Sequence, residues 1–363
     1  MVLPATLQKK TARGRKTKLS VLAFAALGAA VGAGALYSWM FPYEDLFLQS
    51  NLLSQSSSPT KAAVDVMDVG ASKGEGSILF LQSRLQKLRM ESVLAPHTVG
   101  IDIDTQKVST CQNAVKGKQG IDCIEADVLK LYGNGGGSKY MVDKLGTPVV
   151  TGITFWHVLE HMPTVSLAKE IWKSAAGVAS HFASFRGPVF DDADVFDQVE
   201  PKGMHRFFEN WRGHPCHFTS SDLKEAMLSD TKKKPTAHII LIHKPITSSA
   251  SNVILPPGAA VDSHHYNEKE HGPKRIVEFP KVLYEEMRAC AFYGPSLDDS
   301  KLDEQMDEQL LYSAFCFVDA LDAKDSPKIV SCVAEGNLTG EECKAFLKKQ
   351  ALSIIAKAQR LQK

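Results

Sequence analysis

The chain has 363 residues, of which 44% are hydrophobic and 23% charged, and its formal net charge is +1. This length is enough to bury the core of one large α/β domain and to carry further segments. The balanced charge, with no basic groove interleaved with aromatic side chains, argues against a nucleic-acid partner. Seven cysteines without a C-x-x-C pair fit neither a zinc framework nor a small disulfide scaffold. Cys332 and Cys343 could pair in an oxidising compartment, although two buried thiols are the favoured prediction.

The N-terminal segment predicts a membrane anchor. Residues 1–18 form a basic head, and residues 19–43 are uncharged and largely apolar, with aromatic side chains at the end. A run of about 20 such residues can span a bilayer. A single-pass transmembrane anchor is therefore predicted, with a cleaved signal peptide and an organelle presequence followed by an anchor as the alternatives. The basic flank places the N-terminus on the cytosolic or matrix-like side and the body across the membrane. The organelle, mitochondrial or secretory, stays open.

Three further segments follow the anchor. Residues 44–61 are a polar linker, residues 62–250 the main domain, and residues 251–363 a C-terminal extension that ends in an amphipathic helix. Within the anchor, Gly28 and Gly32 have the spacing of a helix-pairing face, which allows a weak homodimer.

The main domain begins with a strand, a glycine-rich turn and a helix. Val64–Val69 is a short apolar run typical of a buried strand, and apolar residues at helical spacing follow from Ser77 onward. Between them, Gly70, Gly74 and Gly76 allow the backbone to lie close to a ligand. A helix N-terminus at such a turn suits a nucleotide-type ligand. The glycine spacing differs from the G-x-G-x-x-G fingerprint of dinucleotide sites.

Strand-like and helix-like segments then alternate. We expect strands at residues 98–104, 121–127, 149–155 and 181–185, and helices at residues 105–116 and 167–179. This alternation predicts a parallel, doubly wound sheet whose ligands bind at the carboxyl ends of the strands.

These features resemble the class I S-adenosylmethionine-dependent methyltransferases, whose first motif is an acid followed by a glycine-rich turn, as at Asp68. The resemblance covers roughly residues 64–186 and implies a Rossmann-like, mostly parallel seven-stranded sheet with S-adenosylmethionine as the cofactor. It assigns Asp68 to the ammonium group, Asp102 to the ribose, with Asp104 as the competing choice, and Asp127 to the adenine. The predicted cofactor-binding residues are Asp68, Gly70, Ala71, Ser72, Gly74, Gly76, Asp102, Ile103, Asp127, Val128 and His157.

The segment from Phe155 to His161 resembles the motif after the fourth strand of small-molecule methyltransferases. A neutral histidine there could accept a proton from the acceptor as the methyl group arrives, which makes His157, His161 and Glu160 the catalytic candidates. In the alternative interpretation the two histidines fix the loop and Glu160 caps the next helix. Methyl transfer is a direct displacement, so alignment of the reactants alone can carry most of the acceleration.

A polar and aromatic stretch follows the fifth strand. Arg206 and Arg212 could hold an anionic group of a small-molecule acceptor, and Trp211 could form an apolar wall. The nearby His214, Cys216 and His217 lack a second ligand pair, so no metal site is predicted.

The C-terminal part is predicted from periodicity alone. We expect a strand at residues 237–245, helices at residues 281–291 and 303–311, and a final helix that Thr339 caps. Asn337-Leu338-Thr339 is a glycosylation sequon, relevant only if this part of the chain is lumenal.

The sequence thus predicts a membrane-anchored methyltransferase that acts on a small molecule. The alternative is a catalytically inactive methyltransferase-like module that binds or assembles partners at a membrane. An NAD-dependent oxidoreductase is disfavoured by the glycine spacing and by Asp68, whose charge would repel a pyrophosphate.

Overall fold

The computed structural model divides the chain into two compact units, Met1–Thr60 and Lys61–Lys363. The described residues all belong to the second unit: 64–72, 84–85, 87, 96–132, 137–192, 205–206, 216–229, 233–248, 254–255, 278–297, 307–322 and 327–361. The predicted anchor, its Gly28 and Gly32, and the linker lie outside them. None of the helices in the described ranges is both long and apolar enough to cross a bilayer.

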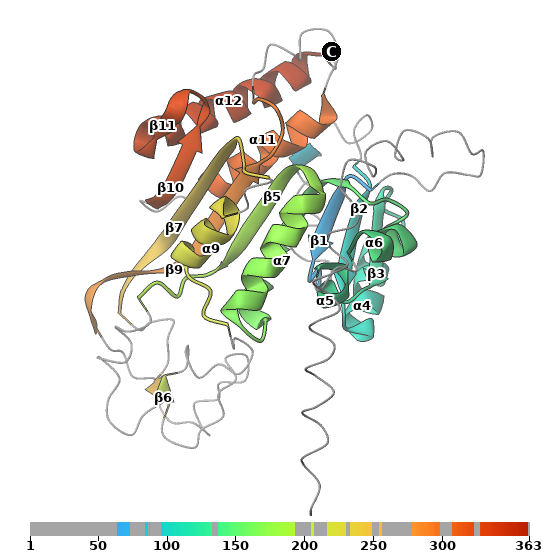
Figure 1. Cartoon of the computed structure of the whole chain (residues 1–363), viewed down its shortest axis with the longest axis horizontal. Helices are drawn as coiled ribbons and strands as arrows, with labels where there is room; N and C mark the ends of the chain where they lie inside the picture. Colours follow the sequence, from blue (N-terminus) through green and yellow to red (C-terminus); the bar gives the residue numbers. More distant parts are fainter. Residues whose placement is uncertain are drawn as a thin grey trace, which may run out of the picture. The chain divides into compact units, whose positions relative to one another are not determined.

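A mixed sheet of nine strands forms the centre of this unit, in the order β11-β10-β7-β9-β5-β4-β1-β2-β3 (Figure 1). Its parallel half confirms the predicted doubly wound arrangement, because β1 pairs in parallel with both β2 and β4, and the outer strands β3 and β5 continue the pattern. The strands of this half are β1 (Val66–Val69), β2 (Thr98–Asp102), β3 (Ile121–Glu125), β4 (Val150–Trp156) and β5 (Ala179–Pro188).

The other half of the sheet corrects two predictions. The sheet has nine strands rather than seven, and residues 281–291, expected as a helix, belong to the strand β9 (Glu278–Phe292). β9 runs antiparallel between β5 and β7 (Ala237–Ser248), the strand expected at residues 237–245. The sheet therefore continues across the predicted domain boundary at residue 250, and β10 (Lys328–Ala334) and β11 (Leu338–Thr339) complete it. A separate two-stranded pair joins β6 (His205–Arg206) and β8 (Ile254–Leu255).

Strand alternation divides the core between the two faces of the sheet. In β7, Ile240 and Ile242 belong to one hydrophobic cluster, whereas Ile239 and Leu241 belong to another. Because successive side chains of a strand point to opposite faces, the two clusters are the two sides of one sheet. Each side is covered by helices, which gives a three-layer α/β architecture.

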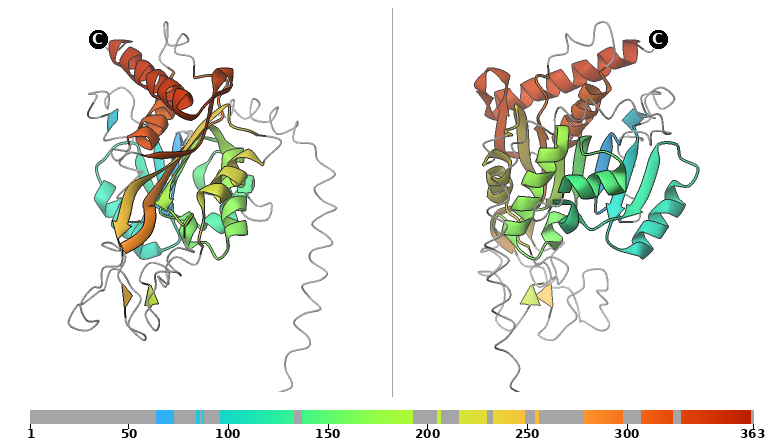
Figure 2. Two further views of the ribbon diagram at one scale, coloured as in Figure 1. Left: turned by 90° about the vertical axis from the view of Figure 1, so that its left-hand side faces the viewer. Right: turned by 45° about the vertical axis from the view of Figure 1, so that its right-hand side comes forward.

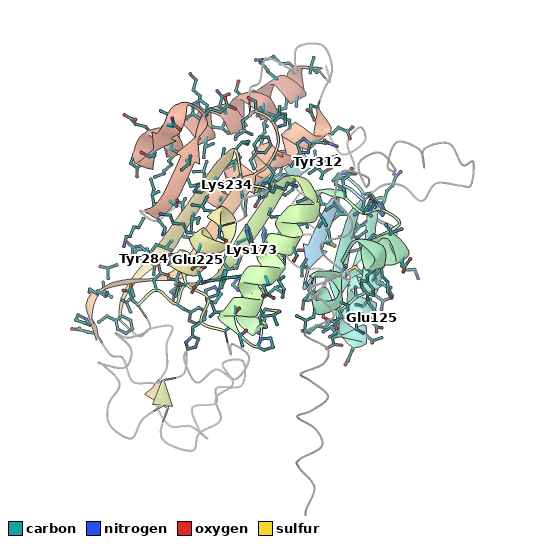
Figure 3. The ribbon with its side chains drawn as sticks, in the orientation of Figure 1. Glu125, Lys173, Glu225, Lys234, Tyr284 and Tyr312 are labelled. Atoms are coloured by element: carbon teal, nitrogen blue, oxygen red, sulfur yellow. A yellow bond between two sulfur atoms is a disulfide. The ribbon has the colours of Figure 1, made fainter. Side chains whose placement is uncertain are left out.

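Figure 2 shows α7 and α9 on one face and α11 and α12 on the other. On the first face, Lys169 of α7 pairs with Asp222 and Glu225 of α9, both at 2.8 Å. Figure 3 labels Glu225 of α9 and Lys173 of α7. The helices are α4 (Thr105–Val115), α5 (Val128–Tyr132), α6 (Gly137–Leu145), α7 (Val165–Val178), α9 (Ser220–Leu228), α11 (Glu308–Leu321) and α12 (Gly340–Leu361).

The C-terminal helices differ in detail from the prediction. The helix expected at residues 303–311 begins at Glu308 and continues to Leu321. The predicted final helix is confirmed as α12, which buries Cys343, Leu347, Ala351, Ile354 and Ala358 along one face and exposes Leu361.

Six of the seven cysteines form disulfides, so the prediction of buried free thiols at Cys332 and Cys343 is wrong. Each bond joins a helix to a strand of the sheet. The pairs are Cys111–Cys123 between α4 and β3, Cys290–Cys316 between β9 and α11, and Cys332–Cys343 between β10 and α12. Only Cys216 is free, and its side chain is buried.

Candidate functional site

The turn after β1 brings the chain back against the ends of the neighbouring strands. Gly70 and Ser72 both have positive φ, +70° and +50°. The N–H groups of Gly70 and Ala71 donate to the carbonyl oxygen of Ile101 in β2, at 2.8 and 3.0 Å. A Cβ on Gly70 would lie 2.3 Å from Cγ2 of Val158, in the loop after β4. Only glycine therefore allows the β1 turn to lie this close to the β4 loop. The predicted Gly74 and Gly76 lie outside the described residues.

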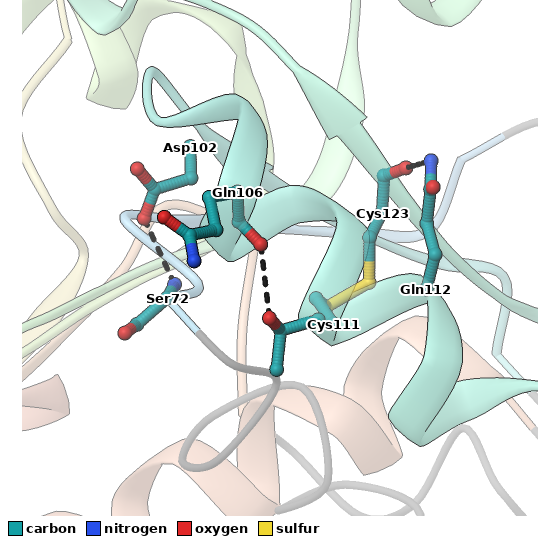
Figure 4. The surroundings of a disulfide bond; sticks show 7 residues. Ser72, Asp102, Gln106, Cys111, Gln112 and Cys123 are labelled. Carbon is teal, nitrogen blue, oxygen red and sulfur yellow. Dashed lines mark hydrogen bonds between the residues drawn. A yellow bond between two sulfur atoms is a disulfide. The ribbon is translucent and has the colours of Figure 1, made fainter.

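Asp102 links this turn to the end of β2. Its carboxylate accepts a hydrogen bond from the N–H of Ser72 at 3.0 Å (Figure 4). It also accepts one from the N–H of Asp104 at 3.0 Å. The residue is 8% exposed. Each carboxylate oxygen can accept two hydrogen bonds, so the two backbone donors leave Asp102 with free acceptor capacity at the ligand edge of the sheet.

Asp104, the competing choice, has a structural role. It is the N-cap of α4, and its side chain accepts from the N–H groups of Gln106 and Lys107 at 2.8 and 3.2 Å. An N-cap carboxylate satisfies helix donors that would otherwise lack a partner. Of the two acids, Asp102 is the one that contacts the glycine-rich turn.

The first predicted acid, Asp68, is buried inside the sheet at 3% exposure. It lies in register with Thr154 of β4, whose hydroxyl donates to the Asp68 carboxylate at 2.7 Å. Asp68 thus lies directly beneath the turn that Gly70 begins, and the β4 strand fixes its orientation.

Apolar side chains follow the ends of the next two strands. Ile103, directly after Asp102, is 67% exposed, and Leu129, after β3, is 37% exposed. Asp127 accepts from the N–H of Leu129 at 2.9 Å, so it begins α5, whose first residue is Val128. Accessible apolar side chains thus lie directly after the predicted ribose residue Asp102 and two residues after the predicted adenine residue Asp127.

His157 and Glu160 form a pair immediately after β4. The imidazole Nδ1 of His157 lies 3.2 Å from Oε1 of Glu160. The His157 side chain is 57% exposed and that of Glu160 only 1%. His157 also has a positive φ of 55°, and its N–H donates to the carbonyl oxygen of Arg186 at 2.7 Å. Strained backbone of this kind, in a residue other than glycine, is concentrated at functional sites.

Glu160 is the buried carboxylate that the His157 ring approaches. Among the residues that the structure describes, His157 is the partner within ion-pair distance of the Glu160 carboxylate. Neither oxygen of this buried carboxylate has a hydrogen-bond partner among the described residues, so Nδ1 of His157 is the nearest donor available to it. In the Nδ1-protonated tautomer of a neutral imidazole, Nε2 is the acceptor. His161, the second candidate, is exposed at the end of the short 3-10 turn Leu159–His161.

Cys216 packs behind the pair. Its N–H donates to the carbonyl oxygen of Glu160 at 3.1 Å, and burial, together with the charges of Asp222 and Glu160, raises the pKa of its thiol to about 11. The thiol is therefore protonated at neutral pH. His217 stacks on Phe190, with ring centroids 4.8 Å apart.

A cationic cluster beside His157 was not predicted from the sequence. The Arg186 guanidinium lies 5.2 Å from the centroid of the Trp156 ring, and its Nε is 2.7 Å from Oε1 of Glu286. His243 and Arg288 approach the same oxygen at 3.1 and 2.8 Å, and Lys244 pairs with the other one. Four basic side chains thus surround one carboxylate.

The charge balance of this cluster fixes the state of Glu286. Burial alone would raise the pKa of Glu286, but hydrogen bonds from His243, Lys244 and Arg288 and the charge of Arg186 hold it far below its usual range. No sequence motif marks the cluster, because its members come from β5, β7 and β9 and meet only through the register of these strands.

The predicted acceptor residues Trp211 and Arg212 lie outside the described residues, as does His214. Arg206 belongs to β6, but its side chain is not among those described. Their predicted role stays a prediction.

No protein-family model matches the chain, and no curated protein matches it. Three similar solved structures illustrate what the chain is similar to. Magnesium protoporphyrin IX methyltransferase from Synechocystis PCC 6803, with bound SAH, is 12% identical, with a TM-score of 0.33, and the match covers 77% of this chain and 90% of that one.

A putative methyltransferase from Bacillus halodurans is 11% identical, with a TM-score of 0.38 and coverage of 68% and 98%. A SAM-dependent methyltransferase from Archaeoglobus fulgidus is 15% identical, with a TM-score of 0.34 and coverage of 69% and 100%. All three are methyltransferases by name, the class that the motifs around Asp68, Asp102 and His157 resemble.

Proposed function

We propose that the protein is an S-adenosylmethionine-dependent methyltransferase that transfers a methyl group directly to a small molecule. The observation that carries the proposal is the contact between the β1 turn and Asp102, through the N–H of Ser72. It places a carboxylate with spare acceptor capacity beside a turn that allows close approach of a ligand, at the carboxyl edge of a doubly wound sheet.

The described residues fit the cofactor. Asp102 would accept from the ribose hydroxyls, the exposed Ile103 would contact the adenine, and the backbone at Gly70 would admit the methionine part. S-adenosylmethionine, when bound, supplies a methyl group made electrophilic by the sulfonium. Asp68 acts through the turn above it, since its own carboxylate is buried against Thr154.

His157 is the proposed general base. A proton on Nδ1 would face Glu160, and the Nε2 lone pair of this partly exposed ring would then accept the proton of an acceptor hydroxyl or amine. Glu160 is a positioning residue, because it acts through His157. Arg186 and Trp156, next to His157 at the strand ends, would form one side of the acceptor site.

The first test is calorimetric titration of residues 61–363 with S-adenosylmethionine and S-adenosylhomocysteine. We expect saturable binding that Asp102→Ala weakens by at least about tenfold, because a hydrogen bond to a charged group contributes about 1.5–3 kcal/mol. Asp104→Ala is the matched control. It removes a neighbouring carboxylate, and we expect it to leave cofactor binding unchanged. Absence of binding by folded protein would contradict the proposal and favour the membrane-tethered, inactive module.

The second test follows release of S-adenosylhomocysteine with a panel of phenols, amines and carboxylic acids. For any acceptor that reacts, His157→Gln should lower kcat by roughly 10²- to 10⁴-fold, the usual contribution of a general base, while cofactor affinity stays unchanged. Glu160→Gln should lower kcat and alter its pH profile, since the ring loses its preferred tautomer. An unchanged kcat in His157→Gln would show that alignment alone carries the reaction.

A further inference from the structure

The pairing of the cysteines points to the compartment in which the chain folds. Three disulfides involve six of the seven cysteines, and they tie α4, α11 and α12 to three different strands of the sheet. Disulfides that are distributed through a fold form and persist in oxidising compartments and are rare in the cytosol. The one free thiol, Cys216, is buried and cannot readily exchange with them.

The only N-x-S/T sequon of the chain lies in the part that the third disulfide closes. Asn337-Leu338-Thr339 falls between Cys332 and Cys343, where the short 3-10 turn Glu335–Asn337 leads into β11. Such a sequon is a glycan acceptor when it lies at the surface of a protein in the secretory pathway.

The turn presents the acceptor side chain to solvent. Asn337 and Thr339 are both exposed. Asn337 has a φ of 59°, a left-handed conformation that asparagine adopts more readily than other side chains. The turn itself is anchored by Glu335, which accepts from Ser296 Oγ at 2.6 Å and from the N–H of Leu297 at 3.1 Å. The carboxamide of Asn337 is therefore held outside the core on a fixed loop.

We propose that residues 61–363 fold in an oxidising, N-glycosylating compartment and that Asn337 carries an N-linked glycan. The predicted anchor agrees with this topology if its basic flank lies on the cytosolic side, because the body would then lie across the membrane from the cytosol. β11 is the edge strand of the nine-stranded sheet. A glycan at Asn337 would shield this edge from pairing with another chain.

Disulfide formation and glycosylation both use reactants that such a compartment supplies. Closing each disulfide removes two protons and two electrons from two thiols, and a protein disulfide oxidant takes them up by exchange and becomes a dithiol. At Asn337 a C–N bond forms between the carboxamide nitrogen and the anomeric carbon of a lipid-pyrophosphate-linked oligosaccharide. The C–O bond to the pyrophosphate breaks, and the carboxamide gives up one proton.

The test expresses the full chain in cultured animal cells and treats the purified protein with peptide N-glycosidase. On electrophoresis, we expect the glycosidase to shift the apparent mass of the wild type by the mass of one glycan, because the chain has one sequon. Thr339→Ala should abolish the shift and Thr339→Ser should retain it. This pair leaves Asn337 and its backbone conformation in place, so a folding defect from replacing Asn337 does not enter the result.

A second measurement counts thiols with a mass-tagged maleimide in denaturant. We expect one tag before reduction, at Cys216, and seven after it. Seven tags without reduction would overturn the proposal, as would a wild type that the glycosidase does not shift. A protein with one tag and no shift would overturn the glycan and place the chain in an oxidising compartment that lacks N-glycosylation.

Discussion

Replacing Gly70 by alanine tests how closely the β1 turn and the β4 loop approach each other. Gly70 has a φ of +70°, and an added Cβ would lie 2.3 Å from Cγ2 of Val158. Two separate costs follow. An L-residue in the left-handed region costs about 1–2 kcal/mol. Displacing the buried Val158 to relieve the overlap adds about 1–3 kcal/mol, the usual range for overpacking.

Gly117 provides the matched control for this substitution. It has a φ of +81°, in the turn after α4, but an added Cβ there would meet no atom within 4 Å. Gly117→Ala therefore carries only the backbone cost of about 1–2 kcal/mol. We expect Gly70→Ala to lower the free energy of unfolding by about 2–5 kcal/mol in all. The difference between the two variants measures the overlap with Val158.

Urea unfolding of both variants at pH 7 checks this expectation, and calorimetry reports cofactor affinity under the same conditions. A double-mutant cycle with Val158→Ala isolates the steric part, since the smaller side chain removes the overlap and leaves φ unchanged. Equal losses in Gly70→Ala and Gly117→Ala would refute the argument, because Val158 would then have moved aside at no cost.

Three further predictions concern stability. His238 is hydrogen-bonded to Ser331, and burial lowers its pKa to about 4. In the unfolded state this imidazole takes up a proton near pH 6.5, whereas the folded state does so only near pH 4. The free energy of unfolding therefore decreases as the pH falls from about 6.5 towards 4. Measured by urea unfolding, the decrease in the free energy of unfolding from pH 7 to pH 5 should be about 2 kcal/mol larger in the wild type than in His238→Asn. Asp191→Ala should cost about 2–3 kcal/mol in the same assay, because it removes the acceptor of the buried Ser220 hydroxyl and N–H. Asp104→Ala should cost about 0.5–2 kcal/mol through the lost N-cap of α4, and an equally stable Asp104→Asn would identify the cap as the cause.

The parallel half of the sheet could be predicted because its signals are local. The strands β1, β2 and β4 are short, buried segments, and the helices α4 and α7 begin with side-chain N-caps. The pair of His157 and Glu160 is local as well, since its members are three positions apart in the sequence. What the sequence could not supply is the positive φ of His157 and the burial of Glu160, which depend on Arg186 and on the packing around the loop.

β9 shows why the other half of the sheet was missed. Residues 281–291 include several strong helix formers, among them Glu285, Glu286, Met287 and Ala289, and they were predicted as a helix. In the structure β9 pairs with a strand on each side, β5 and β7, so its backbone groups are satisfied by both neighbours. Pairing on both edges outweighs intrinsic propensity, which is a weak preference of under 1 kcal/mol per residue.

The same reasoning applies to the contacts that β9 makes. Glu286 meets Arg186 and His243 only because β9 lies in register with β5 and β7, and Cys290 meets Cys316 only because α11 crosses that part of the sheet. None of these pairs has a sequence spacing that distinguishes it from chance. Motif analysis finds residues that one loop brings together, as in the turn at Gly70, whereas charge clusters and disulfides between elements depend on strand order. The cationic cluster beside His157 and the Cys290–Cys316 disulfide were therefore hidden for one physical reason, namely that both require the position of β9 in the sheet.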